Sequence, residues 1–103
     1  MGTPEWAIPS LEAVIDSGCE ISAVFTQPDR PFGRKRQLKA SPIKQFSLEQ
    51  KLTVHTPEKA GSPETLELAR ELNPELILVC AYGQILPQSF LDIPQVGCFN
   101  LHF

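Results

Sequence analysis

The stretch "ELILVCAYGQILP", residues 75–87, decides the fold of this chain. Its first part, residues 76–82, is apolar throughout, without polar alternation. That pattern is typical of a central parallel strand covered by helices on both faces. The second part carries Gly83, Gln84 and Pro87, and its simplest interpretation is a strand that ends in a turn. The stretch therefore predicts a buried parallel sheet.

Elements of both kinds alternate on either side of this stretch. Short apolar runs predict further strands at residues 20–26, 52–56 and 97–103. Thr3-Pro4 predicts the N-cap of a helix that Gly18 ends and Pro9 bends, and the same start signal recurs at Ser41-Pro42 and Ser62-Pro63. Strands and helices in series imply right-handed crossovers and a Rossmann-like α/β fold, with a doubly wound, mainly parallel sheet and helices on both faces.

The start of the chain departs from this pattern. The first predicted helix begins two residues after Met1, so the strand expected at the centre of the sheet is reduced to Met1-Gly2. We expect residues 1–103 to form one partial domain, an excerpt of something longer that lacks its first strand. Doubly wound sheets bind ligands outside the carboxyl ends of their strands. That rule places four segments on one rim: residues 3–4, 27–39, 82–84 and 100–102.

Composition excludes several classes of protein. A chain of 103 residues with 42% apolar content buries one modest core. It has no apolar run long enough to cross a bilayer and no secretory signal, so we expect a soluble, cytoplasmic protein. Its three cysteines, Cys19, Cys80 and Cys98, lack C-x-x-C spacing and are expected to be small buried hydrophobes, with no disulfide framework and no metal site. The first turn lacks G-x-G-x-x-G, so no nicotinamide site is predicted.

Charge is divided sharply along the sequence. The net charge is −3, but the loop RPFGRKRQLK, residues 30–39, holds five basic residues and no acidic one. The rest of the chain keeps four of the nine basic residues against all twelve acidic residues. Two interpretations stay open: a solvated face, or a loop shaped by Pro31 and Gly33 that follows a phosphate backbone.

The last predicted strand carries a polar pair. Alternation along GCFNLHF, residues 97–103, puts Cys98, Asn100 and His102 on one side of an extended segment. Taken alone, an N-x-H pair is most simply two satisfied polar groups at the end of a sheet. An amide and an imidazole aimed at one point can also stabilise an oxyanion and move a proton.

Five segments carry a resemblance to a known family. In order and near their usual spacing, they are MGTPEWAIPSLEAV, FTQPDRPFGR, SPIKQF, AYGQILP and GCFNLH. Over essentially all 103 residues, the chain resembles the amino-terminal half of the catalytic domain of methionyl-tRNA formyltransferases. AYGQILP and N-x-H are specific to the folate-dependent formyltransferase and hydrolase superfamily, and QPDRP-x-GR points to the tRNA enzymes within it.

The resemblance implies substrates and roles for residues. The donor would be 10-formyltetrahydrofolate and the acceptor the amino group of methionyl initiator tRNA, and no metal takes part. Asn100 and His102 match the oxyanion-stabilising and proton-handling pair. The folate pocket would be lined, partly through backbone groups, by Tyr82, Gly83, Gln84, Ile85 and Leu86. The acceptor arm of the tRNA would be approached by Arg30, Arg34, Lys35, Arg36 and Lys39. Arg34 matches the family's G-R pair, whereas Lys35 stands where a second glycine is common.

The family pattern continues beyond what the chain supplies. A small residue and an S-L-L-P segment normally follow the histidine, with a catalytic Asp further on; Phe103 stands at the small-residue position, and Asp92 does not align with that Asp. We therefore expect residues 1–103 alone to lack useful transferase activity, and the intact enzyme to be a monomer. Two alternatives stay open. One is another superfamily enzyme, such as a glycinamide ribonucleotide or sugar-nucleotide formyltransferase or a formyl-folate hydrolase, and the other is a non-catalytic fragment that binds tRNA or folate weakly, or binds nothing.

Overall fold

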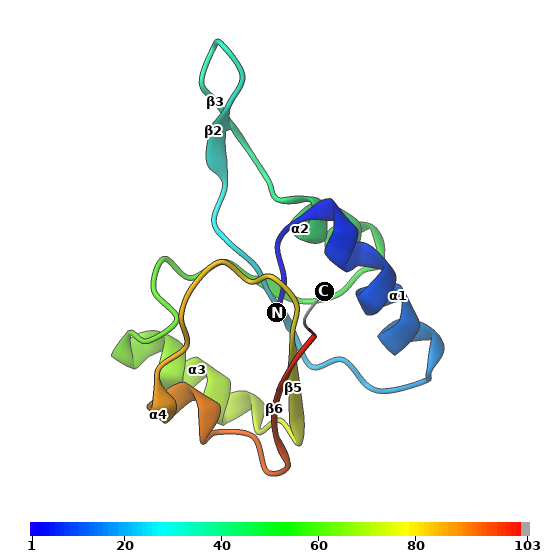
Figure 1. Ribbon diagram of the computed structural model, residues 1–103, viewed down its shortest axis with the longest axis vertical. Coiled ribbons are helices and arrows are strands. Elements are labelled where there is room, and N and C mark those ends of the chain that lie inside the picture. The colour runs from blue at the N-terminus through cyan, green and yellow to red at the C-terminus, as the bar shows by residue number, and fades with distance from the viewer. Residues whose placement is uncertain (102–103) are drawn as a thin grey trace.

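The structure, a computed structural model, describes residues 1–101, with Phe32 by its backbone alone (Figure 1). Helices and strands alternate along the chain, as the sequence predicted. In order they are the 3-10 helix η1 (Glu5–Ala7), α1 (Ile8–Asp16), β1 (Val24–Phe25), β2 (Arg30–Phe32), β3 (Gln37–Lys39), α2 (Pro42–Glu49), β4 (Val54–His55), α3 (Pro63–Leu72), β5 (Leu76–Val79), α4 (Gln88–Leu91) and β6 (Gly97–Asn100).

Met1 and Gly2 join two parallel strand pairs into one sheet. β1 pairs with β4, and β5 pairs with β6, both in parallel. Gly2 N donates to Phe25 O at 3.0 Å on one side, while Cys80 N donates to Met1 O at 2.8 Å on the other. Gly2 and Cys80 also form a parallel bridge. The order β4, β1, Met1-Gly2, β5, β6 confirms the doubly wound α/β fold. Met1 and Gly2 take the place of the central strand.

Each face of this sheet has its own hydrophobic core. Neighbouring strand residues point to opposite faces, so Phe25 belongs to one cluster and Val24 to the other. The Phe25 cluster includes Tyr82 and Phe90 and is covered by α3 and α4. The other cluster lies under η1, α1 and α2. Figure 1 shows the two helix pairs on opposite sides of the strands, as predicted for helices on both faces.

Two of the three predicted helix starts are confirmed. The Ser41 hydroxyl caps α2 by accepting from Lys44 N at 3.0 Å, and the Ser62 hydroxyl caps α3 by accepting from Thr65 N at 3.2 Å. Both caps are followed by proline in the first turn, where its missing N–H costs nothing. Asn73, with φ +47°, ends α3 in the left-handed conformation.

The predicted start of the first helix is wrong. Thr3 does not cap it, because the Thr3 hydroxyl donates to Tyr82 O at 2.6 Å instead. Pro9 does not bend a helix interior either. The chain forms η1 first, and α1 begins at Ile8 with Pro9 in its first turn, where proline replaces no intrahelical hydrogen bond.

The strands are shorter than predicted, and one cysteine is misplaced. β5 ends at Val79 rather than at Tyr82, because Ala81 adopts φ +50° and turns the chain out of the sheet. Cys80 is buried and Cys98 is half-buried, but Cys19 is exposed just after the α1 terminus, so the expectation of three buried thiols is wrong for Cys19.

The basic segment, residues 30–39, is a β-hairpin rather than an irregular loop. β2 and β3 pair antiparallel, with Arg30 opposite Lys39. Pro31 lies in β2 and not in the turn, which proline tolerates because a two-stranded ribbon has free edges. The turn is closed by Arg36 N donating to Gly33 O at 3.2 Å, with positive φ at both residues. The hairpin projects from the body of the molecule (Figure 1).

We expect the stability of the 103-residue polypeptide to rise between about pH 6 and pH 8. The Met1 ammonium donates to Leu78 O at 2.7 Å inside the sheet, and burial lowers the pKa of this amine from 8.0 to about 6. In that window the folded chain keeps the amine neutral while the unfolded chain still binds the proton, so the free energy of unfolding grows with pH, by about 2–3 kcal/mol in total. Urea unfolding at either end of the window measures it.

The matched control is the same polypeptide with an acetylated amino terminus. Its amide N–H still reaches for Leu78 O but does not titrate. Burial raises the pKa of the Cys98 thiol, so this neighbour does not titrate in the window either. An equal pH dependence in both polypeptides would contradict the assignment to Met1.

Candidate functional site

The carboxyl ends of the strands meet at one rim of the sheet. Strand order reverses at Met1-Gly2, since β1 continues the sheet on one side and β5 on the other. Thr3, Gln27 and residues 81–84 follow these three central positions directly. A parallel sheet binds its ligands at such a reversal point. The geometry therefore brings three of the four segments predicted for the rim to one edge, with Asn100 close to the end of the neighbouring strand.

Residues 81–87, called the rim strap here, leave the sheet after β5 in an irregular conformation. Ala81 and Gly83 have φ of +50° and +99°. Tyr82 turns inward and is 2% exposed, so its side chain belongs to the core and only its backbone reaches the rim. Burial raises the pKa of Tyr82 to about 12.

Gln84 also turns inward, toward the segment of residues 57–60. Gln84 Oε1 accepts from Ala60 N at 2.8 Å, and Gln84 Nε2 donates to Gln27 Oε1 and to Glu58 O, both at 3.1 Å. A longer contact of 3.4 Å runs to Pro57 O. The side chain predicted to line a folate pocket is therefore engaged with the protein itself.

The next two residues point in opposite directions. Ile85 is 97% exposed, the most exposed of the large apolar side chains on the described part of the chain. Leu86 is half-buried against the Phe25 cluster. The rim strap thus presents one isolated apolar side chain and a stretch of backbone at the carboxyl edge of the sheet.

Asn100 lies at the end of β6, as the sequence predicted. It pairs in register with Val79, and Leu101 N donates to Val79 O at 2.8 Å. Its side chain is exposed and lies on the same face as that of Ile77. Its predicted partner His102 lies outside the described residues.

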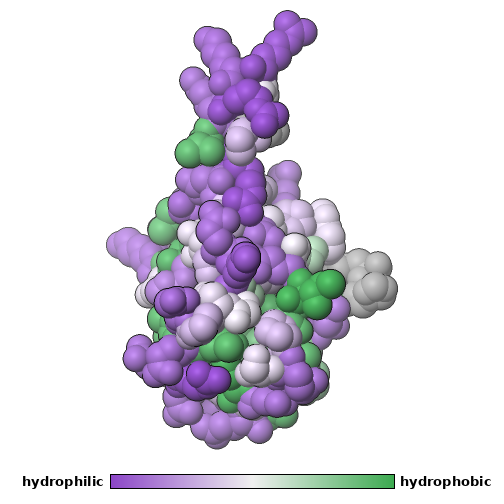
Figure 2. All heavy atoms as spheres, turned by 90° about the vertical axis from the view of Figure 1, so that its left-hand side faces the viewer, coloured by the Kyte–Doolittle hydropathy of each residue, from purple (hydrophilic) through white to green (hydrophobic). Residues whose placement is uncertain are grey.

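The five cations of the hairpin occupy two levels. Arg34, Lys35 and Arg36 form the turn at its tip, and all three are exposed. Arg30 and Lys39 face each other across the base, where Arg30 lies 3.8 Å from the Glu58 carboxylate. Figure 2 shows the projecting hairpin as a mainly hydrophilic arm above a body with apolar patches.

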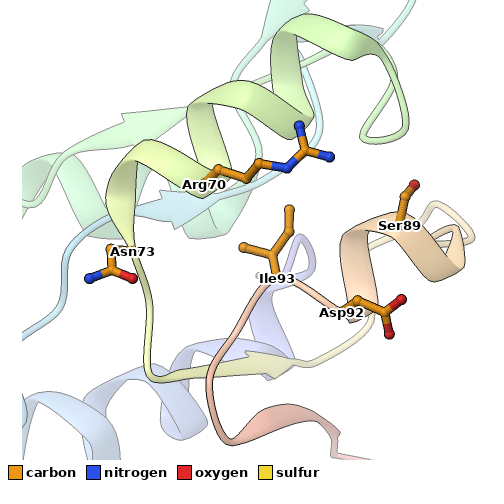
Figure 3. Close-up of a pocket in the computed structure, with 5 residues that line it drawn as sticks. All are labelled: Arg70, Asn73, Ser89, Asp92 and Ile93. Atoms are coloured by element: carbon orange, nitrogen blue, oxygen red, sulfur yellow. The ribbon is translucent and has the colours of Figure 1, made fainter.

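A hollow of about 310 Å³ is lined by Lys39, at the base of the hairpin, and by residues of η1, α1 and α2. Another of about 510 Å³ lies between α3 and α4, where Arg70, Asn73, Ser89, Asp92 and Ile93 line it (Figure 3). Its charged groups have partners nearby: Arg70 lies 3.8 Å from Glu67, and Asp92 accepts from Gln88 at 2.7 Å. Within residues 1–101 no three His, Cys, Asp or Glu side chains are grouped to hold a metal ion, and no helix there is long and apolar enough to span a membrane.

The sequence placed Thr3 and Gln27 on the rim but gave no sign that these residues hold it together. Thr3 fixes the rim strap through Tyr82 O, and Gln27 accepts from Gln84. Thr3 carried a signal that pointed to a helix cap, and Gln27 carried none. Both act through contacts more than fifty residues away in sequence, which no local pattern reports.

Comparison with known proteins identifies the family. The sequence model of the formyl transferase family matches residues 1–103. The chain is 49% identical over 102 residues to a methionyl-tRNA formyltransferase of Ruminiclostridium cellulolyticum, covering 99% of the chain and 33% of that protein. Similar enzymes of Geobacter sulfurreducens and Clostridioides difficile are 51% and 46% identical over 102 residues, covering 99% of the chain and 32% and 33% of their lengths. The chain spans about a third of the length of these curated relatives.

We expect Gly83→Ala to destabilise the protein more than Gly18→Ala. Both glycines have positive φ, so both substitutions carry the cost of an L residue in that region, about 1–3 kcal/mol. A Cβ at Gly83 would lie 2.7 Å from Gln27 Nε2, whereas one at Gly18 meets nothing within 4 Å. Displacing Gln27 adds about 1 kcal/mol. Urea unfolding of the two variants measures the difference in the free energy of unfolding. Equal losses of stability would show that the Gln27 side chain can move aside at no cost.

Proposed function

The chain belongs to the formyl transferase family, and we propose that residues 1–103 form part of the catalytic domain of an enzyme that formylates methionyl initiator tRNA. The observation that supports this proposal is sequence identity of 46–51% to methionyl-tRNA formyltransferases over nearly the whole chain. The formyl donor would be 10-formyltetrahydrofolate, used in the cytoplasm by a monomeric enzyme at the start of protein synthesis. No metal is required.

Asn100 and His102 would carry the chemistry. An uncharged amine attacks the formyl carbon and leaves negative charge on the former carbonyl oxygen. The Asn100 side chain lies exposed at the carboxyl end of β6 and supplies N–H donors for that oxygen without adding charge. A histidine, with an ordinary pKa of about 6.5, handles the amine's proton near neutral pH. Residues 1–103 do not include the expected catalytic Asp, so we expect no useful activity from them alone.

The rim strap would hold the folate donor. It lies beside the end of β6, at the rim where a doubly wound sheet binds ligands. Ile85 supplies an exposed apolar surface for a flat ring, and the backbone of Tyr82, Gly83 and Leu86 supplies polar groups. Gln84 would contribute through its backbone too, because its side chain is occupied.

The hairpin would bind the acceptor tRNA. Its exposed tip, with Arg34, Lys35 and Arg36, projects beyond the body and is free to follow a phosphate backbone. Arg30 and Lys39 add charge at its base. Other members of the superfamily act on nucleotides or sugar nucleotides, or hydrolyse formyl-folate, and those substrates give no reason for such an arm. Comparing formyl acceptors separates these enzymes from the one proposed.

We expect Asn100→Ala to lower the rate of formyl transfer by the full-length protein about 100- to 1,000-fold, because one oxyanion donor is lost. The effect should fall on kcat, with little change in the KM for the donor. Asn100→Asp keeps the shape, removes the N–H donors and adds charge, so it should be at least as slow. A rate within a few-fold of the unmodified enzyme in either variant would refute the assignment.

We expect Arg34→Ala to weaken tRNA binding and to reduce the slope of log Kd against log salt by about one unit, since one phosphate contact is lost. Arg70→Ala is the matched control, because Arg70 is an exposed arginine on α3, beside the hollow shown in Figure 3. Fluorescence anisotropy over a salt series measures both. Equal slopes for the two variants would exclude Arg34 as a phosphate contact.

A further inference from the structure

We propose that Gln84 is a positioning residue, which clamps the rim strap to Gln27 and to residues 57–60. Its side chain would act through the conformation of the strap and not through a contact of its own with a ligand. For the part that concerns the donor, the inference rests on the proposed function. Hydrogen bonds, burial and one close approach support the clamp.

The hydrogen-bonding capacity of the Gln84 amide is almost fully used inside the protein. A glutamine offers one carbonyl oxygen and two N–H donors. The oxygen accepts from Ala60 N, and the two donors serve Gln27 Oε1 and Glu58 O, with Pro57 O at longer range. The Ala60 N–H fixes the orientation, because a flipped amide would set donor against donor. Little capacity is left for a ligand.

These bonds join three segments that are far apart in sequence. Gln84 lies 57 residues from Gln27 and 24 from Ala60. Ala60 is fully buried at 0% exposure, and its N–H donates to the Gln84 oxygen. A buried N–H without a partner is unfavourable. The clamp therefore ties the segment before α3 to the rim strap.

Gly83 makes the close approach of Gln27 possible. A Cβ at Gly83 would lie 2.7 Å from Gln27 Nε2 and 3.3 Å from its Cγ, so the side chain lies flat against a residue that has none. Gln27 thus packs on Gly83 and accepts a hydrogen bond from Gln84 at once. The rim strap has no strand partner at these positions among the described residues, and this contact takes the place of one.

The consequence falls on Ile85, which follows the clamped residue directly and is 97% exposed. With the Gln84 side chain held inward, the side chain of the next residue, Ile85, points outward at the rim. If the clamp opens, Ile85 and the backbone beside it lose their fixed position. Loss of the clamp should therefore weaken donor binding without removing any group that touches the donor.

The test compares Gln84→Ala with Gln45→Ala in the full-length protein. Gln45 Nε2 donates to one backbone carbonyl, Ala40 O, at an exposed place on α2, so its loss matches the residue type without the clamp. Hydrogen exchange is followed by mass spectrometry over residues 57–62 and 81–87. We expect exchange about tenfold faster or more in both segments of Gln84→Ala, and unchanged in Gln45→Ala.

Gln84→Glu separates positioning from simple loss of volume. Its carboxylate would face Gln27 Oε1 and the carbonyls of residues 57 and 58, so it opens the clamp at neutral pH. Protonation at about pH 5 restores one O–H donor, because neighbouring oxygens raise the pKa of such a carboxyl. After correction for intrinsic rates, protection should return at low pH in Gln84→Glu but not in Gln84→Ala. If Gln84→Ala does not fold, Gln27→Ala replaces it, and faster exchange over residues 81–87 is expected.

Binding of 5-formyltetrahydrofolate, a stable relative of the donor, is measured in parallel. We expect affinity about three- to tenfold lower in Gln84→Ala and unaltered in Gln45→Ala. Wild-type exchange rates in Gln84→Ala, or identical pH profiles for the Ala and Glu variants, would overturn the clamp. Absence of binding by the unmodified protein would instead count against the proposed function, and the exchange data would still decide the clamp.

Discussion

The hydrogen bonds of Met1 and Gly2 are the constraint on which the rest of the structure depends. Without them the sheet is two pairs of short strands, and an isolated pair is marginal in water. Gly2 N and Met1 O each serve a different pair, so two residues connect both halves. The approach is close enough that a Cβ on Gly2 would lie 2.9 Å from Cys80 O. Glycine is needed here because the sheet closes around it.

The same junction explains why the rim is held by side chains. Strands that leave a reversal point diverge, so the loops after them have no regular backbone partners, and their buried polar groups must be satisfied in other ways. Thr3, Gln27 and Gln84 do this by reaching across to carbonyls and amides of neighbouring loops. These hydrogen bonds hold the loops of a ligand site at such a point in a defined conformation, although none of the loops is a helix or strand.

The sequence predicted the elements whose signal is local. The Ser-Pro starts of α2 and α3 depend on nearby residues, and they formed as expected. Of the apolar run predicted as a buried strand at residues 76–82, only residues 76–79 form β5, with Leu76 exposed and the other three half-buried. Thr3-Pro4 carries the same local signal as the Ser-Pro starts, yet the Thr3 hydroxyl does not cap a helix, because it donates a hydrogen bond to Tyr82 O, 79 residues away. Asn100 was placed at the rim by the rule that doubly wound sheets bind ligands outside the carboxyl ends of their strands. Gln84 was not foreseen as a clamp, because a glutamine in a loop gives no sign of which way it points.

Charge separates the hairpin from the body in a way that bears on any polyanion. The hairpin holds five of the nine cations, while all twelve acidic residues lie elsewhere in the chain. The ion pair between Arg30 and Glu58 is 3.8 Å long with both side chains more than half exposed, a geometry that contributes little energy. At the tip, Arg34, Lys35 and Arg36 form no ion pair within the described part of the chain, so the tip keeps its positive charge. The rest of the chain carries twelve acidic against four basic residues, so its net field opposes a polyanion whereas that of the hairpin favours one.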